Sequence, residues 1–147
     1  MAEHNIIGHK GEQIAVETMR KKGFRVVDTN WKFGHLEMDV IAVNRKEIAF
    51  VEVKTRTSSF GDKRPEEFVD ELKRRRMAAA ANAYIKIHQI ELVPRFDIIG
   101  ISMDPNTYEV KELTHLEDAF LPPQRTIGKS SFSGQGRWKH RGRVIGK

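Results

Sequence analysis

Two short apolar runs rich in β-branched side chains constrain the fold of this chain more than any other stretch. They are Val40–Val43 and Ile48–Val51, and the polar turn Asn44–Glu47 separates them. Uninterrupted apolar runs of this length are typical of strands covered on both faces. We therefore expect a hairpin over Leu36–Arg56 at the centre of a sheet.

Charged residues interrupt this pattern where the second strand ends. Glu52 and Lys54 are two residues apart, so they point to the same face of the strand. A hairpin that pairs Val43 with Ile48 places Asp39, at the start of the first strand, near Glu52 or Val53. The sequence therefore predicts that two carboxylates and an ammonium meet at one end of the hairpin.

Two buried carboxylates held close together are stable only with a compensating cation. Oxygen ligands suit Mg²⁺ or Mn²⁺, whereas Zn²⁺ prefers His or Cys. We predict that Asp39, Glu52 and the main-chain carbonyl of Val53 bind the metal, with Lys54 facing whatever the metal binds. The alternative is a solvated Glu-x-Lys strand face preceded by an ordinary turn aspartate.

The spacing of these residues resembles a known nuclease signature. Asp39, followed after twelve residues by Glu52-Val53-Lys54, resembles the PD-(D/E)xK motif. A longer series resembles, in the same order, the YraN-like family of uncharacterised bacterial proteins: Asn30-Trp31, Glu37–Ile41, Phe50–Arg56, Phe60-Gly61 and Arg95–Asp97. The likeness runs from about Gly8 to Phe120, and Leu36 departs from it because Gly usually precedes the Glu-x-Asp.

That family is similar in fold to restriction endonucleases and archaeal Holliday junction resolvases. The resemblance implies a nuclease-like core, and the likeness to junction resolvases is consistent with a homodimer. It also marks Glu12 as an accessory acidic residue of the site, although a Glu in a first helical turn is equally well explained by the helix dipole. Glu37 is a further site member if its strand has already begun at that point. For Arg95 and Asp97 a structural ion pair is the more economical explanation.

The fold that we predict is α/β: a restriction-endonuclease-like mixed sheet of about five strands, flanked by helices. Outside the hairpin, the expected elements are a helix over Ile7–Lys22, a strand over Phe24–Trp31, a long helix from Pro65, strands over Arg95–Ile101 and Tyr108–Leu113, and a last short turn over Leu116–Phe120. Residues 1–121 would form one endonuclease-like domain. Residues 122–147 would form an extended basic C-terminal arm.

Charge is distributed unevenly between these two parts. The chain has 26 Lys and Arg against 20 Asp and Glu, but seven of these cations and no acid lie from Pro122 onward, so the rest is close to neutral. A basic arm with an aromatic residue suits contact with phosphates and stacked bases, and a solubilising tail or a partner-docking strand is the alternative. The predicted nucleic-acid contacts are Arg56, Lys73 and Arg76 in the domain, and Arg137, Trp138, Lys139, Arg141 and Arg143 in the arm. For Lys73 and Arg76 a solvated helix face is the alternative.

Composition excludes several classes of protein. There is no cysteine, which rules out disulfides, thiolate zinc sites and cysteine nucleophiles. The sequence has no apolar run long enough to span a membrane and no secretory signal, so we expect a cytoplasmic protein.

These features favour metal-dependent hydrolysis of phosphodiester bonds in DNA, branched DNA included. The alternatives are a nucleic-acid-binding module that keeps the nuclease scaffold without turnover, and a protein-interaction subunit whose tail docks on a partner.

Overall fold

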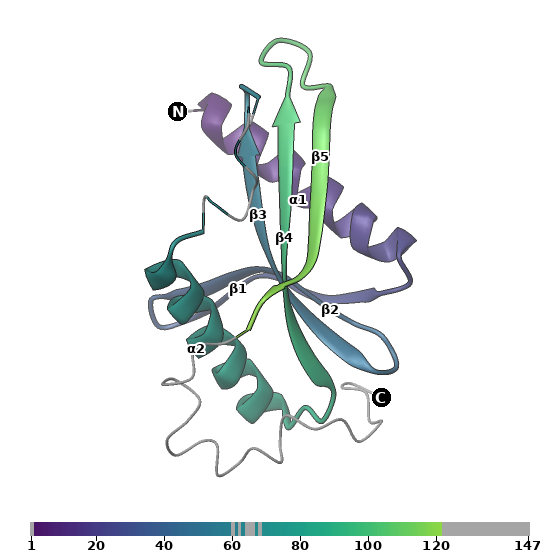
Figure 1. The fold of residues 1–147 in the computed structure, drawn as a ribbon, viewed down its shortest axis with the longest axis vertical. Coiled ribbons are helices and arrows are strands. Elements are labelled where there is room, and N and C mark those ends of the chain that lie inside the picture. The colour runs from purple at the N-terminus through teal and green to yellow at the C-terminus, as the bar shows by residue number, and fades with distance from the viewer. Residues whose placement is uncertain (1, 60, 62, 64–66, 68, 122–147) are drawn as a thin grey trace.

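The structure, a computed structural model, describes residues 2–59, 61, 63, 67 and 69–121. These residues form two helices and five strands in the order α1 (Ala2–Lys21), β1 (Arg25–Phe33), β2 (Leu36–Val43), β3 (Glu47–Arg56), α2 (Glu71–His88), β4 (Val93–Met103) and β5 (Val110–Phe120). Figure 1 shows how they are arranged. The predicted α/β class, with a mixed sheet of five strands flanked by helices, is confirmed. The predicted C-terminal arm lies outside the described residues.

The five strands form one sheet in the order β1-β2-β3-β4-β5. Only β3 and β4 are parallel, and α2 lies in the connection between them, as a parallel crossover requires. The hairpin register is the predicted one, because Val43 pairs with Ile48 and Val40 pairs with Val51. The central strands carry apolar side chains on both faces, so both faces of the sheet must be covered.

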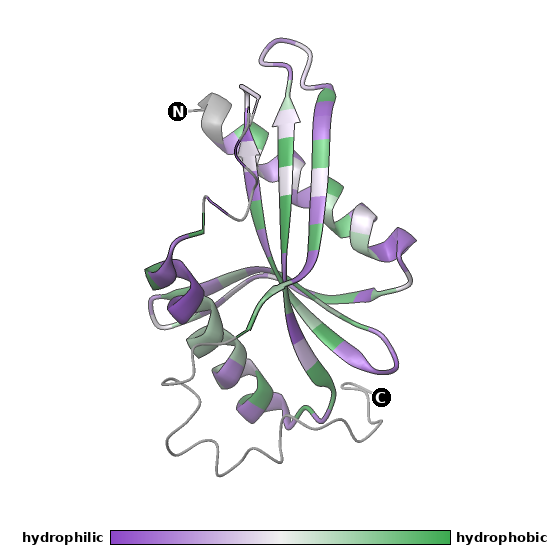
Figure 2. Ribbon diagram, in the orientation of Figure 1, coloured by the Kyte–Doolittle hydropathy of each residue, from purple (hydrophilic) through white to green (hydrophobic). Residues whose placement is uncertain are grey.

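One helix covers each face of the sheet. Figure 1 shows α1 crossing behind β3, β4 and β5, with α2 on the opposite side beside β1 and β2. Ile48 and Phe50 of β3 pack into the core under α2, whereas Ala49 and Val51 pack into the core under α1. Figure 2 shows hydrophobic and hydrophilic bands along β4 and β5. No helix among the described residues is long and apolar enough to cross a membrane.

The second helix begins later than predicted. Its first residue is Glu71 rather than Pro65, and Asp70 caps it by accepting a hydrogen bond of 2.8 Å from the Lys73 N–H. An N-cap aspartate satisfies an otherwise unpaired donor of the first turn, and this fixes the start of the helix. Pro65 and Glu66, on which the prediction rested, lie outside the described residues.

The last strand is longer than predicted. It extends over Val110–Phe120, so Leu116–Phe120 is strand rather than a separate turn. Leu116 pairs with Ile98 and Phe120 with Phe96, and a register shift lies between these two pairs. Asp118 has a positive φ of 52° at this irregularity, which obscures the alternation expected of a strand.

Arg95 and Asp97 form the structural ion pair that was the more economical expectation. An Arg95 guanidinium nitrogen lies 2.9 Å from Asp97 Oδ2, and His115 Nε2 lies 2.7 Å from the same oxygen. Asp97 is fully buried, and it also accepts a hydrogen bond from the Asp118 N–H. These contacts join β4 to β5 and satisfy the Asp97 carboxylate within the fold, so Asp97 is a structural residue.

The Asp70 cap predicts a specific loss of stability. Replacing Asp70 with Ala should lower the free energy of unfolding by about 1 kcal/mol, because the Lys73 N–H loses its acceptor. Urea denaturation followed by circular dichroism measures the change. Asp70→Asn, which keeps a capping oxygen, is the matched control and should stay within about 0.5 kcal/mol of wild type. Equal losses in both variants would show that the cap does not hold the helix start.

Candidate functional site

The sheet forks between β2 and β3 at the end of the hairpin. The β2–β3 ladder begins at the pair Val40 and Val51, whereas β3 continues to pair with β4 as far as Arg56. Residues Leu36–Met38 pair with β1 but not with β3. Backbone groups of β3 beyond Val51 therefore have no strand partner on the β2 side, and the fork needs another acceptor.

The Asp39 carboxylate supplies that acceptor. Its Oδ2 accepts a hydrogen bond of 2.8 Å from the Val53 N–H, so a side chain replaces the missing strand. The N–H and C=O of one strand residue point toward the same neighbour, so the Val53 carbonyl faces the same fork. The three predicted metal ligands, Asp39, Glu52 and Val53, thus belong to one locality.

Glu52 is the buried acid of the site. It is only 6% exposed and lies on the face covered by α2, where Lys73 Nζ is 3.5 Å from its Oε1. Burial, followed by the charge of Asp39, raises its pKa to about 7, and the charges of Lys73 and Lys54 partly offset this rise. The positive charges around Glu52 therefore do not fully offset the effects of its burial and of Asp39.

Asp39 experiences the same conditions. Burial raises its pKa, and the charges of Glu12 and Glu37 add to that effect, while the Val53 N–H and the charge of Lys73 oppose it. The structure therefore brings four predicted acidic residues near one another: Asp39, Glu52, Glu12 and Glu37. They come from α1, β2 and β3, far apart in the sequence.

Glu12 reaches this region because α1 lies very close to β3. A Cβ added at Gly11 would overlap the Thr55 methyl group, so only glycine allows this approach. Asn30 of β1 then donates a hydrogen bond of 2.9 Å from Nδ2 to Glu12 Oε1. Asn30 has a positive φ of 50°, which asparagine tolerates better than most residues.

The model of the uncharacterised protein family UPF0102 matches residues 11–101 of this chain. The chain belongs to the UPF0102 family. The matched range contains every described residue of the site, from Glu12 to Lys73, and the predicted YraN-like resemblance is thereby confirmed at the level of the family.

Curated UPF0102 proteins from several bacteria are similar to this chain. The relative from Parabacteroides distasonis is 42% identical over 125 residues, which are 85% of this chain and 100% of that protein. The relative from Bacteroides thetaiotaomicron is 40% identical over 123 residues, covering 84% of this chain and 98% of that protein. The relative from Flavobacterium psychrophilum is 40% identical over 121 residues, covering 82% and 98%. These relatives are thus matched over nearly their whole length, whereas part of this chain lies outside each match.

The donors in this UPF0102 chain fit a hard divalent cation that keeps several waters. Among the residues that the structure describes, no three His, Cys, Asp or Glu side chains are close enough to hold a metal ion by themselves. Magnesium does not require three protein ligands, because it usually binds through one or two carboxylates and retains water. The buried Glu52 and the half-buried Asp39, both with raised pKa, meet that requirement, and Glu12 is already bonded to Asn30.

The predicted nucleic-acid contacts of this UPF0102 chain have different environments. Arg56 is half-buried at the end of β3, and Arg76 is exposed on α2. Lys73, on the same helix, lies against Glu52. The five predicted contacts in the arm lie outside the described residues.

Two site residues of this UPF0102 chain could not be assigned from its sequence. Asn30 belongs to the Asn30-Trp31 pair of the family likeness, but nothing in the sequence joins it to Glu12. Lys73 is one of four consecutive basic residues, so its sequence context gave no reason to single it out as the partner of Glu52.

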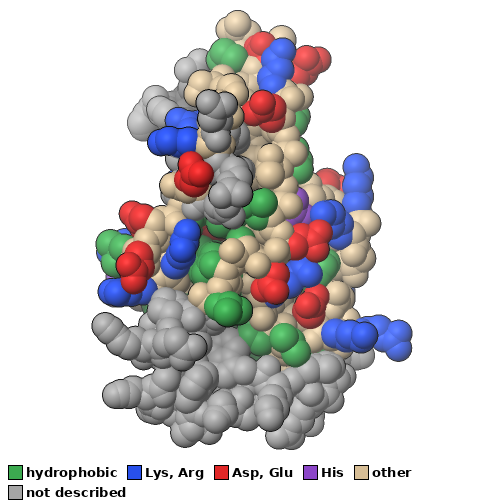
Figure 3. All heavy atoms as spheres, in the orientation of Figure 1, with side chains coloured by type: hydrophobic (Ala, Val, Ile, Leu, Met, Phe, Trp, Pro, Cys, Tyr) green, Lys and Arg blue, Asp and Glu red, His purple; other side chains and the backbone are tan. Residues whose placement is uncertain are grey.

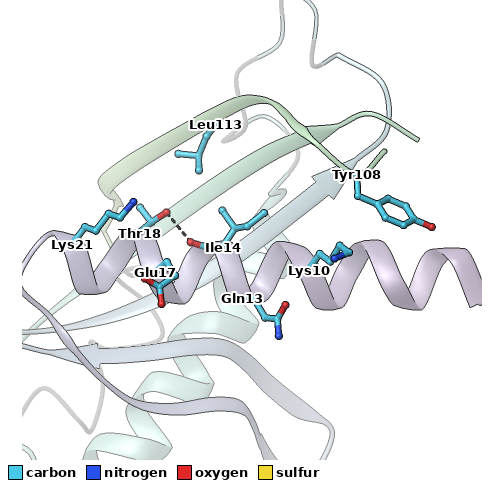
Figure 4. A pocket seen from close by; sticks show the side chains of 8 residues that line it. All are labelled: Lys10, Gln13, Ile14, Glu17, Thr18, Lys21, Tyr108 and Leu113. Atoms are coloured by element: carbon cyan, nitrogen blue, oxygen red, sulfur yellow. Dashed lines mark hydrogen bonds between the residues drawn. The ribbon is translucent and has the colours of Figure 1, made fainter. Parts of the chain in front are cut away.

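A hollow of about 420 Å³ lies elsewhere, between α1 and β5. Figure 4 shows Lys10, Gln13, Glu17 and Lys21 of α1 on one side, with Leu113 and Tyr108 on the other. None of the predicted site residues lines it. Its lining mixes acidic and basic side chains and contains neither member of the carboxylate pair.

The contact between Gly11 and Thr55 predicts a steric effect. Gly11→Ala should lower the free energy of unfolding by about 1–3 kcal/mol, because the new methyl group forces α1 away from β3. Gly8→Ala is the matched control on the same helix: a Cβ there meets no atom within 4 Å, so this variant should gain up to about 1 kcal/mol. Urea denaturation measures both. Adding Thr55→Ser to Gly11→Ala removes the opposing methyl group and should restore stability, and no restoration would rule out the steric explanation.

The raised pKa of Glu52 predicts how stability depends on pH. The unfolded chain loses this proton near pH 4.5 and the folded chain near pH 7, so the folded state binds more protons between these values. Stability should therefore fall as the pH rises through this window, by up to about 3 kcal/mol at this site. Urea denaturation in EDTA from pH 5 to pH 8 measures the slope. Glu52→Gln should flatten it, and an unchanged slope in that variant would contradict the assignment.

Proposed function

We propose that this chain is a metal-dependent nuclease that hydrolyses phosphodiester bonds in DNA. One observation carries the proposal: Asp39 and Glu52, on neighbouring strands, meet at a fork of the sheet, where Glu52 is buried, Asp39 is half-buried, and burial raises the pKa of both. Buried acids whose pKa is shifted by burial and by one another are typical of catalytic and metal sites. A purely structural role does not explain two such groups, because Asp97 shows how the same fold satisfies a structural carboxylate.

Asp39 and Glu52, with the Val53 carbonyl, would hold Mg²⁺ or Mn²⁺. When bound, such an ion lowers the pKa of a water molecule and offsets charge on a phosphate. The Val53 N–H already fixes the direction of the Asp39 carboxylate at 2.8 Å, so that ligand is oriented before any ion arrives.

Lys54 is the proposed catalytic cation. It follows Glu52 by two residues on β3, so both side chains lie on the same face of the strand, and its charge acts on Glu52. An ammonium there can orient the attacking water or stabilise negative charge that develops on the phosphate. Glu12, held by Asn30, and Glu37, exposed at the rim, would orient water around the site.

Recognition of DNA would depend on backbone contacts. On the face drawn in Figure 3, basic and acidic side chains are interspersed over the described residues, in agreement with the near-neutral composition of the domain. We assign the main electrostatic attraction to the basic residues after Pro122, with Arg56 and Arg76 as further contacts among the described residues. Attraction of this kind is independent of base sequence and weakens with salt.

A cleavage assay with three proteins tests this function. Wild type should cut duplex, flapped or four-way DNA in Mg²⁺ and not in EDTA, whereas Glu52→Gln and Lys54→Met should lose activity by at least about 100-fold. Lys54→Met should still bind DNA in a fluorescence anisotropy titration, because it leaves the basic arm intact.

Controls separate the enzyme from its alternatives. Equal cleavage by all three proteins would indicate a contaminating nuclease. Tight, salt-sensitive DNA binding without cleavage in Mg²⁺ or Mn²⁺ would overturn the enzyme and favour a non-catalytic nucleic-acid-binding module. Wild type that neither binds nor cuts DNA would leave a protein-interaction role.

A further inference from the structure

Lys73, a predicted nucleic-acid contact, lies beside the carboxylate of Glu52 in the structure. Its Nζ lies 3.5 Å from Glu52 Oε1, and the two side chains are 37% and 8% exposed. The pair thus joins a buried carboxylate to an ammonium that remains in contact with solvent. Because it is partly exposed, this ammonium can move away from the carboxylate into solvent.

The position of Lys73 in its helix is electrostatically unfavourable. It lies in the first turn of α2, where its own N–H is bonded to the Asp70 cap. A cation near a helix N-terminus is disfavoured by the helix dipole, and Arg76, three residues further on, is a like charge on the neighbouring helix surface. The contact with Glu52 offsets these terms, so the location of the lysine depends on the acid.

Lys73 also acts on both members of the carboxylate pair. Its charge lowers the pKa of Asp39 as well as that of Glu52, against the larger effect of burial on each. Lys73 therefore supplies positive charge at the place where the proposed function requires a metal ion. Two cations that neutralise the same oxygen compete for it.

We propose that Lys73 is a resident counter-ion of the site: its ammonium neutralises Glu52 in the metal-free protein and competes with a divalent cation for that carboxylate. The inference rests on the metal site of the proposed function and adds a positioning residue from α2 to it. Once displaced, the ammonium is at the rim of the site, where it can contact a phosphate of the substrate. Lys73 thus has one partner before metal binding and another afterwards.

Binding of Mn²⁺ to the full chain tests the competition, with free Mn²⁺ measured by electron paramagnetic resonance. Lys73→Gln removes the competing charge and should tighten Mn²⁺ binding roughly three- to tenfold. Lys73→Arg keeps the charge and should bind Mn²⁺ within about twofold of wild type. Arg76→Gln removes an exposed charge from the same helix and should also remain within about twofold. Unchanged or weaker binding by Lys73→Gln would overturn the inference.

A metal-free measurement gives a second readout. At pH 8 in EDTA, Lys73→Gln should lower Tm by roughly 3–8 °C, because it leaves Glu52 buried without its partner. The double variant Lys73→Gln/Glu52→Gln should melt within about 2 °C of Glu52→Gln alone, because the lysine has no carboxylate left to neutralise. Additive effects of the two substitutions would overturn the counter-ion role.

The two proposals can fail separately. Mn²⁺ binding that tightens in Lys73→Gln, together with no cleavage of any DNA, would overturn the proposed nuclease and support the counter-ion. Wild type that binds no Mn²⁺ would overturn the metal site and the competition together, and the metal-free measurement would still decide whether Lys73 neutralises Glu52.

Discussion

The hydrogen bond from the Val53 N–H to the Asp39 carboxylate is the contact on which the site depends. It lies where β2 leaves β3, and it replaces the strand-to-strand bond that the fork removes. An ordinary strand end would satisfy this donor with water. Here the acceptor is a carboxylate, so the hydrogen bond that satisfies the Val53 N–H also holds the Asp39 carboxylate close to Glu52.

Burying Glu52 close to Asp39 is electrostatically unfavourable, and the cationic side chains of the protein offset this only in part. Lys54 and Lys73 oppose the rise in the pKa of Glu52, yet that pKa still reaches about 7. By contrast, the buried Asp97 has Arg95, His115 and a backbone N–H as partners, and its pKa is lowered. The two buried acids differ in their partners: the charge of Asp97 is offset within the fold, whereas the pKa of Glu52 remains raised.

Much of this could be predicted from the sequence, because the relevant information is local. The apolar runs at Val40–Val43 and Ile48–Val51 determine a hairpin, and the register of a hairpin follows from its turn and its pattern. The convergence of Asp39 with Glu52 then follows from counting residues along two strands. The likeness of Gly11-Glu12 to the family added the one acidic residue that comes from another element.

Other features could not be predicted because they depend on contacts between distant segments. The bond of Asn30 to Glu12 requires the packing distance between α1 and the sheet, which Gly11 sets by the absence of a side chain. The partner of Lys73 depends on where α2 begins, and the signals at Pro65 placed that start too early because the Asp70 cap determines it. The end of β5 was obscured by the irregularity at Asp118, which breaks the strand pattern.

The single parallel pairing in the sheet has a consequence for the order of assembly. The β2–β3 hairpin closes through neighbours in sequence, whereas β4 is synthesised only after the whole of α2. Contacts of large sequence separation form late, because closing the intervening loop costs entropy. Until β4 and α2 dock, β3 is an edge strand and Glu52 lies in water. The emerging polypeptide therefore carries Asp39 and Glu52 before it has the surroundings that bury Glu52, and the two acids acquire their environment only when the last strands are in place.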